Sequence, residues 1–370
     1  MPLAIGVPGV TTPPAGAVVK TARQQEAAGF DSIWWSDHLM GWHPEAIWTP
    51  EFTPLALRTP SPHVFLDHIA CQTVAAMSTE RVRIGVGVTE PVRHHPAMLA
   101  QQYLTLDHFS GGRTILGMGT GEGENTIPYG LDFSRPVGRL EEALEIIRLL
   151  WSTDEPVDFD GDFWTMRGAV MGLQPLEAGP PPIWLAGLGP RMLGVTARLA
   201  DGWIPIGLTA KDYADKLARI LQLRDDAGRT GTFTPGLFMF SVVDEDEAAI
   251  DEILSHPIVR VLGLVAPGWM YEDAGAEHPL GADFHGLTDY IPTRFDREAA
   301  LAAIDRVPEE VLRRFLLCGT PDAIATRLRE YEAAGCEHAV VWNVSFLTDL
   351  SKVASSFRLM AELRADLAGG

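Results

Sequence analysis

Short apolar segments alternate with helical patterns along almost the whole chain, and this alternation limits the possible folds most strongly. A typical helical pattern follows Pro136, where Leu140, Leu144, Ile147 and Trp151 share one face. Continuously apolar strands separated by helices indicate a parallel sheet covered by helices. The eight segments with the composition of buried strands lie at 3–7, 30–36, 82–88, 113–119, 182–187, 203–206, 236–243 and 339–342.

Eight such units predict a (β/α)8 TIM barrel, in a single domain over residues 1–370. A barrel of this kind needs about 250 residues. The remaining length falls mainly in 39–62, 153–181 and 255–310, which predicts insertions after strands 2, 4 and 7. A doubly wound sheet is the alternative, and it requires a Gly-x-Gly-x-x-Gly fingerprint after an early strand. Counted from Gly117 or Gly119, the sixth position holds Glu122 or Glu124 instead of glycine.

The charge and the apolar pattern exclude several classes of function. The 370 residues include 49 acidic and 29 basic residues, and the formal net charge is −20. A chain of this kind lacks the basic face that nucleic-acid binding and polybasic membrane attachment need. We find no apolar run long enough to span a membrane and no signal-peptide pattern at the N-terminus. Three widely spaced cysteines form no disulfide framework, so we expect a cytoplasmic protein.

Candidate catalytic residues follow the ends of two predicted strands. Asp37 and His38 end strand 2, and Trp42 follows shortly after. Histidine suits proton transfer near neutral pH, and a neighbouring carboxylate can orient its ring. The alternative for a lone histidine is a core position with a bond to a backbone carbonyl. The glycine-rich segment 117–125 follows strand 4 and carries Glu122 and Glu124 as candidate proton donors, unless it is only a solvated loop.

Glycine is also frequent where strand 5 passes into a helix. Gly187, Gly189, Pro190 and Arg191 stand there. The free N–H groups at a helix N-terminus bind anions, and an arginine adds a positive charge. An ordinary turn between strand and helix is the alternative. The alternating glycines of 117–123 also suggest a binding surface. Because they carry no side chains, they would let the backbone approach a flat ring or a phosphate.

Other kinds of site have less support. Strand 1 carries no metal ligand, and His94 and His95 lack chelating spacing, so we expect no metal. No Gly-x-Ser-x-Gly or P-loop motif occurs, so nothing indicates acyl transfer or NTP hydrolysis. Four tryptophans around strand 2 suggest an aromatic wall for a planar cofactor or an apolar substrate, unless some of them belong to the core. They are Trp34, Trp35, Trp42 and Trp48.

Taken together, the motifs at 36–38, 85–91, 119–125 and 187–190 resemble those of the luciferase-like barrel superfamily. More narrowly, they are similar to its coenzyme F420-dependent branch. The chain looks most like the phthiodiolone dimycocerosate ketoreductases of that branch, above all in 277–284, where barrel architecture alone does not force agreement. The resemblance covers essentially the whole chain.

This resemblance implies an oxidoreductase that transfers a hydride between C5 of reduced F420 and a ketone or a similar electrophile. His38 or Glu122 would supply the proton, Trp42 would line the pocket, and Asp37 would orient His38. A sugar phosphate is not expected, because no lysine lies between Lys216 and Lys352 to hold it. An FMN-dependent monooxygenase and a non-catalytic cofactor-binding protein are the alternatives. The branch also implies a homodimer.

The residues that would hold the cofactor follow motif by motif. A non-prolyl cis bond between Gly87 and Val88 would face the ring, and the segment around Arg191 would hold the phosphate arm. Because the chain is acidic and the cofactor is anionic, binding requires local donors such as Arg191 and the adjoining helix N-terminus. The complete predicted set is Asp37, Gly87, Val88, Gly121, Glu122, Asn125, Ala186, Gly187, Gly189, Pro190, Arg191 and Met192.

Overall fold

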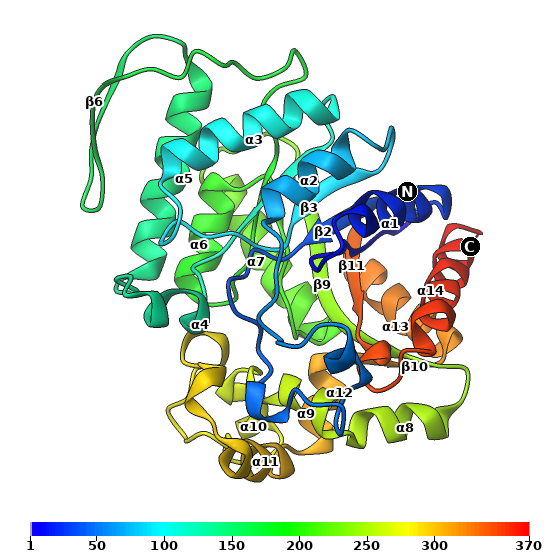
Figure 1. Cartoon of the computed structure of the whole chain (residues 1–370). Coiled ribbons are helices and arrows are strands. Elements are labelled where there is room, and N and C mark those ends of the chain that lie inside the picture. The colour runs from blue at the N-terminus through cyan, green and yellow to red at the C-terminus, as the bar shows by residue number, and fades with distance from the viewer. Residues whose placement is uncertain (1, 370) are drawn as a thin grey trace.

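Parallel strands and surrounding helices alternate through the computed structural model, which describes residues 2–369 (Figure 1). The strands are β1 (Ala4–Pro8), β2 (Ser32–Trp35), β3 (Arg83–Val86), β4 (Thr114–Met118), β5 (Val157–Asp160), β6 (Thr165–Ala169), β7 (Ile183–Leu185), β8 (Gly202–Trp203), β9 (Thr234–Val243), β10 (Leu316–Gly319) and β11 (His338–Asn343).

The α-helices are α1 (Gly16–Ala27), α2 (His68–Ala76), α3 (Pro96–Ser110), α4 (Gly123–Thr126), α5 (Pro136–Ser152), α6 (Pro190–Leu199), α7 (Ala210–Asp226), α8 (Glu247–Ser255), α9 (Pro257–Leu264), α10 (Gly268–Asp273), α11 (Arg297–Asp305), α12 (Glu309–Phe315), α13 (Pro321–Ala333) and α14 (Lys352–Gly369). Short 3-10 helices are η1 (Glu45–Ile47), η2 (Pro54–Leu57), η3 (Ile127–Tyr129), η4 (Gly286–Thr288), η5 (Pro292–Arg294) and η6 (Ser345–Leu347). No helix within 2–369 is both long and apolar enough to cross a membrane.

Eight parallel strands close the barrel in the order β9-β11-β1-β2-β3-β4-β7-β8, and β8 pairs with β9 again. The predicted (β/α)8 barrel is therefore confirmed, with each predicted strand in its place. The long strand β9 also pairs with β10 beyond its contact with β8. The sequence did not predict β10, which adds a ninth strand at the carboxyl end of β9.

Two indoles fill the centre of the barrel. Trp34 and Trp184 are fully buried, and their ring centroids lie 5.4 Å apart. Glycines on neighbouring strands make room for them: a Cβ on Gly85 would lie 2.7 Å from the Trp34 ring, and one on Gly202 would lie 2.6 Å from the Trp184 ring. Trp34 and its neighbour Trp35 therefore belong to the core, and the prediction that both line an aromatic wall is wrong.

The first and third insertions pack together beyond the carboxyl ends of the strands (Figure 1). Nε2 of His43 lies 2.9 Å from the carbonyl oxygen of Ile258 in α9, and burial lowers the pKa of this histidine to about 4. Ile47 and Trp48 join the same apolar cluster as α9 and α11. His43 is therefore a structural residue that fastens the two insertions to each other.

The second insertion follows α5 and forms the hairpin of β5 and β6 on the outside of the barrel. The carboxylate of Glu142 in α5 accepts backbone N–H groups of Asp162, Phe163 and Trp164 at the hairpin turn. The hairpin therefore lies along α5.

Candidate active site

The loops after β2 and β4 meet at the carboxyl end of the barrel, and Asn125 holds them together. Its Oδ1 accepts the backbone N–H groups of Leu39 at 2.7 Å and Met40 at 3.0 Å. Its Nδ2 donates to Oε1 of Glu124 at 3.0 Å, and the side chain is buried. The structure thus gives Asn125 the role of a clamp between two loops, while its predicted contact with a cofactor stays a prediction.

Two glutamates converge on a single indole N–H. Nε1 of Trp42 lies 3.0 Å from Oε1 of Glu124 and 3.3 Å from Oε2 of Glu122. Glu124 is fully buried, whereas the Glu122 side chain is 23% exposed. Trp42 therefore contacts Glu122, and Glu124 joins them from inside the protein.

His38 lies against the same pair. Its Nδ1 is 3.0 Å from the carbonyl oxygen of Met40, which can only accept, so this nitrogen carries a proton. Its Nε2 then faces Oε2 of Glu122 at 3.6 Å. The ring stacks on Phe65 with centroids 5.5 Å apart, and its edge meets Trp42. Nε2 and the exposed carboxylate of Glu122 are thus the polar atoms that the site offers to a ligand.

Burial and charge set the protonation of the two glutamates apart. Burial raises the pKa of Glu124 well above its usual value, and the negative charge of Glu122 raises it further. Burial also acts to raise the pKa of Glu122, but the charge of His38, the hydrogen bonds with Glu124 and Trp42, and the charge of Arg93 outweigh it, so the net pKa is lowered. Of the two carboxyl groups, Glu124 therefore holds a proton more readily, and Glu122 carries the negative charge more readily.

Asp37 faces away from His38, contrary to the prediction. Its carboxylate lies 2.9 Å from Nε2 of His94, 3.0 Å from Nη2 of Arg93 and 3.2 Å from Nδ1 of His68. It makes no contact with the His38 imidazole in the part of the chain that the structure describes. Consecutive residues at a strand end point to opposite sides. Asp37 therefore supports the loop from beneath, while His38 faces the mouth of the barrel.

Alternating glycines in the segment after β4 serve packing within the chain. A Cβ on Gly117 would overlap the carbonyl oxygen of Val86, and one on Gly119 would lie 2.9 Å from the Val88 side chain. A Cβ on Gly123 would overlap the carbonyl oxygen of Thr288 from the third insertion. These glycines are explained by close contacts with the protein's own backbone and side chains. Only Gly121 remains for the predicted approach to a ring, and it has a positive φ of 95°.

The other predicted ring contacts line the floor of the barrel mouth. The bond between Gly87 and Val88 is cis, as the resemblance implies. Val88 and Ala186 are partly buried and pack on the cluster that contains Trp34 and Trp184. These two small side chains therefore cover the central indoles.

The segment after β7 provides a helix N-terminus with free donors. Pro190 begins α6, and no side chain among the described residues caps this end. A Cβ on Gly189 would have no other atom within 4 Å, so the backbone here faces open space. Met192 is buried and packs against Gly187, so it contributes backbone rather than side chain to this surface. The geometry fits an anion.

Arg191 extends from this helix end into solvent. Its Nη2 lies 3.2 Å from Oε2 of Glu141, and the side chain is 64% exposed. Arg198, about two helical turns further along α6, pairs with the same glutamate. Both arginines of α6 thus pair with one glutamate of α5, and the charge of Arg198 also acts on Glu145 of the same helix.

Aromatic residues that the sequence analysis did not single out line the same mouth. Phe240 lies 5.3 Å from Trp42 between ring centroids, 5.2 Å from Phe238 and 6.3 Å from Trp342. Phe238 and Phe240 are two residues apart on β9, so both point to one side of the strand. That spacing in a predicted strand was the available signal. Together with Phe65, these rings give the site an apolar wall.

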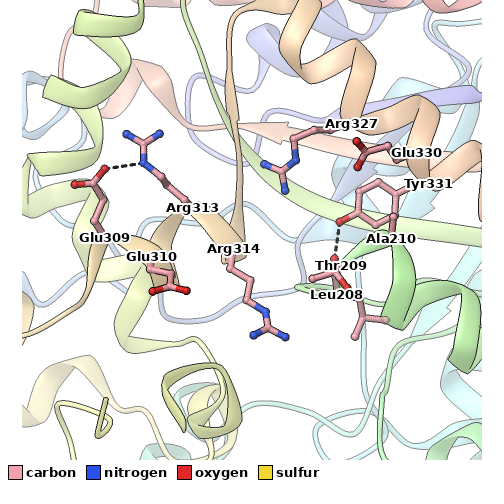
Figure 2. A pocket seen from close by; sticks show the side chains of 10 residues that line it. All are labelled: Leu208, Thr209, Ala210, Glu309, Glu310, Arg313, Arg314, Arg327, Glu330 and Tyr331. Carbon is pink, nitrogen blue, oxygen red and sulfur yellow. Dashed lines mark hydrogen bonds and ion pairs between the residues drawn. The ribbon is translucent and has the colours of Figure 1, made fainter. Parts of the chain in front are cut away.

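A separate cavity of about 580 Å³ opens between α7, α12 and α13 (Figure 2). Figure 2 shows Arg313 turned toward Glu309 and the Tyr331 hydroxyl toward the backbone of Leu208. None of the predicted site residues lines it. Its three acidic and three basic side chains balance: Glu309, Glu310, Glu330, Arg313, Arg314 and Arg327. The candidate active site therefore stays at the barrel mouth.

The parallel barrel with its site at the carboxyl end is that of a luciferase-like oxidoreductase. The family model described as luciferase-like monooxygenase matches residues 2–338, and the chain belongs to this family. The chain is 35% identical over 329 residues to the phthiodiolone/phenolphthiodiolone dimycocerosates ketoreductase of Mycobacterium kansasii. The aligned region covers 86% of this chain and 88% of that relative.

Solved structures agree on the fold. An F420-dependent secondary alcohol dehydrogenase in complex with an F420-acetone adduct superposes with a TM-score of 0.73 at 21% identity, covering 95% of this chain and 98% of that one. An FMN complex of a type II Baeyer-Villiger monooxygenase from Pseudomonas putida superposes with a TM-score of 0.66 at 17% identity, covering 99% of both chains. Both kinds of cofactor therefore occur on this fold.

Proposed function

We propose that this chain uses coenzyme F420 to interconvert a ketone and an alcohol at the mouth of the barrel. The observation that carries the proposal is the proton-bearing group of His38, Glu122 and Glu124 at the edge of an apolar pocket. Such a group suits protonation of a substrate oxygen. The similarity to a ketoreductase and to an F420-dependent alcohol dehydrogenase supports the same chemistry.

The residues around the site fit a deazaflavin with a phosphate arm. The uncapped N-terminus of α6 and the open backbone at Gly189 would receive the phosphate, with Arg191 as a further donor. Val88 and Ala186 would lie beneath the ring. Bound there, the cofactor would supply the hydride.

The chain itself would position the substrate and supply the proton. Glu122 is the exposed member of the acid pair, and Nε2 of His38 lies beside it. A positioned acid of this kind contributes about 10²–10⁴-fold to the rate. Trp42 fixes both carboxylates through its N–H and turns an aromatic edge to the pocket.

The substrate class follows from the wall of the pocket. Phe65 packs on His38, Phe240 packs on Trp42, and Trp342 packs on Phe240, so apolar rings adjoin the residues that contact the acid pair. A pocket lined mainly by aromatic side chains favours an apolar molecule. The few polar groups of such a pocket then orient the polar atom of the bound molecule. We therefore propose a ketone on a hydrophobic body, such as a lipid or polyketide chain. The homodimer and the cytoplasmic location stay predictions.

The decisive experiment measures cofactor binding by fluorescence titration with F420 and, separately, with FMN. We expect tight binding of F420 and turnover of reduced F420 with a long-chain ketone. Arg191→Ala should weaken F420 binding by about 10–100-fold, the range for a hydrogen bond to a charged group. Arg198→Ala is the matched control, because it removes the other arginine on Glu141 but lies away from the helix N-terminus.

A deazaflavin without the phosphate tests whether Arg191 contacts the phosphate arm of the cofactor or its ring. Arg191→Ala should leave its binding unchanged, since the lost contact belongs to the phosphate. Binding of FMN in preference to F420, with consumption of oxygen, would support the monooxygenase alternative and refute the proposal. No binding of either cofactor would refute both.

A further inference from the structure

We propose that Glu124 is the proton reservoir of this site: it shares one proton with Glu122 and passes it through Glu122 to the oxygen of the substrate. The inference rests on the proposed carbonyl reduction and adds a residue that the sequence analysis mentioned only as one of two acids. Glu124 is fully buried, so it reaches the substrate only through its neighbour. It is therefore a positioning residue.

The geometry favours one proton on the pair of carboxylates. Both lie within hydrogen-bond distance of the single N–H of Trp42, and Asn125 donates to Glu124 from the other side. Two buried like charges so close together are strongly unfavourable. Oε2 of Glu124 is buried and has no hydrogen-bond partner within residues 2–369, which an ionised oxygen would need. A proton on Glu124 removes the repulsion, and an unpartnered neutral oxygen costs far less free energy in the interior than an unpartnered charged one.

Few charged groups face the pair. His38 lies beside both carboxylates, with its Nδ1 3.9 Å from Oε1 of Glu124. Arg93 acts on Glu122 from the loop after β3, and the charge of Glu124 helps to raise the pKa of the buried Tyr290 in the third insertion. Arg93 is already paired with Asp37 and Glu90. These groups favour one negative charge on the pair rather than two.

A metal ion is the competing occupant of this cluster. One atom each of His38, Glu122 and Glu124 lie within 4.8 Å of one another. The carboxylate oxygens nearest the centre, however, already accept N–H groups of Trp42 and Asn125. Donor hydrogens directed at these oxygens occupy the lone pairs that a cation would need. The arrangement therefore favours a shared proton.

The proposed proton transfer conserves atoms and charge. As the carbonyl carbon gains the hydride, the O–H bond of Glu122 breaks and the O–H bond of the alcohol forms. Glu122 has gained that proton from Glu124, whose own O–H bond breaks as the new one forms. The pair then carries two negative charges and recovers one proton from solvent through the exposed edge of Glu122. Alcohol oxidation would use the same path in reverse.

An infrared measurement on the protein without cofactor tests the proton directly. At pH 7 we expect the absorption of a protonated carboxyl group, and we expect it to disappear in Glu124→Gln. The control is Glu142→Gln, which alters another buried glutamate far along α5 and should retain the band. If the band survives in Glu124→Gln, the assignment is overturned. This readout is independent of the proposed function.

The pH profile of a single turnover tests the pathway. Glu124→Gln keeps the shape and can still donate an N–H to Glu122, but it holds no transferable proton. We expect an unchanged melting temperature and unchanged F420 binding. The rate at neutral pH should fall by about 10²-fold, the lower range for loss of a general acid. This defect should shrink as the pH is lowered, because Glu122 then takes its proton from solvent.

Two further results bear on the same inference. Glu124→Asp retains an acid and should recover part of the lost rate at neutral pH. A defect in Glu124→Gln that is equal at every pH would indicate a purely structural role and would overturn the proposal. Stoichiometric binding of Zn²⁺ to the unmodified protein, abolished in Glu124→Gln, would also overturn it in favour of a metal site.

Discussion

Replacement of Asp37 by Asn keeps the size of the side chain but removes its charge, and it should destabilise the protein substantially. The carboxylate is buried, accepts the Thr89 hydroxyl at 2.6 Å and lies within 3.2 Å of nitrogens of His68, His94 and Arg93. Removing one partner of a buried ion pair costs about 3–5 kcal/mol. Because Arg93 keeps its second partner, Glu90, at 2.7 Å, we expect the lower end, about 3 kcal/mol.

This loss can be converted into a melting temperature. An unfolding entropy of about 2.1 cal/mol/K per residue gives roughly 0.8 kcal/mol/K for 370 residues. A loss of about 3 kcal/mol therefore lowers Tm by about 4 °C, measurable by calorimetry at pH 7. The matched control is Asp366→Asn, which breaks an exposed pair with Arg329 and should lower Tm by less than about 1 °C.

The same substitution carries a pH signature. Burial acts to raise the pKa of Asp37, but His68, His94 and Arg93 outweigh it and hold the pKa well below the usual value. A lowered carboxyl pKa stabilises the folded state above the unfolded pKa of about 3.9, and this contribution is lost as the pH falls further. The difference between the two proteins should therefore be constant from pH 7 to about 5 and shrink below about 4. A Tm change under 1 °C at pH 7, or a difference that grows in acid, would refute the reasoning.

Three further substitutions test the site. Trp42→Phe keeps an aromatic ring but removes the N–H that both carboxylates share, so kcat should fall at least tenfold, about 1.4 kcal/mol, in steady-state assays, with Tm nearly unchanged. Gly123→Ala places a methyl group against the carbonyl oxygen of Thr288 and should cost about 1–3 kcal/mol by denaturant unfolding, whereas Gly172→Ala, which meets open space, should not. Arg191→Lys should recover less than half of the F420 binding free energy that is lost in Arg191→Ala, because lysine cannot form a bidentate contact. Titration with F420 measures both losses.

The barrel could be predicted because its strands are covered on both faces. Each strand is then apolar throughout, which makes it visible in a single sequence. The same property hid the role of the tryptophans, since Trp34 points into the barrel and Trp35 toward the helices, and both are buried. Composition alone could not separate them from Trp42. The helices of 255–310 were not predicted because they are short, and α9 begins at Pro257, a residue type that elsewhere interrupts helices.

Strand-end positions predicted where the site lies, but not which side chains meet in it. His38, Trp42 and Glu122 do meet, because the loops after β2 and β4 converge. The alternation of side chains at the end of β2 could have separated Asp37 from His38 in advance. The partner of Glu122 could not be predicted, because the contact of Glu124 with Trp42 depends on how a loop folds across 82 residues of sequence separation.

Because one amide fastens both active-site loops, changes in the two loops should not behave independently during evolution or engineering. The backbone of Leu39 and Met40 opens the first insertion, and Asn125 ties it to the segment that bears the acid pair. If residues 39–62 were exchanged to alter the substrate range, Glu122 and Glu124 would also move unless the backbone N–H groups at positions 39 and 40 still donated to Asn125. We expect strong epistasis between the two segments, so a library that varies them together should yield active variants that neither single-loop library contains.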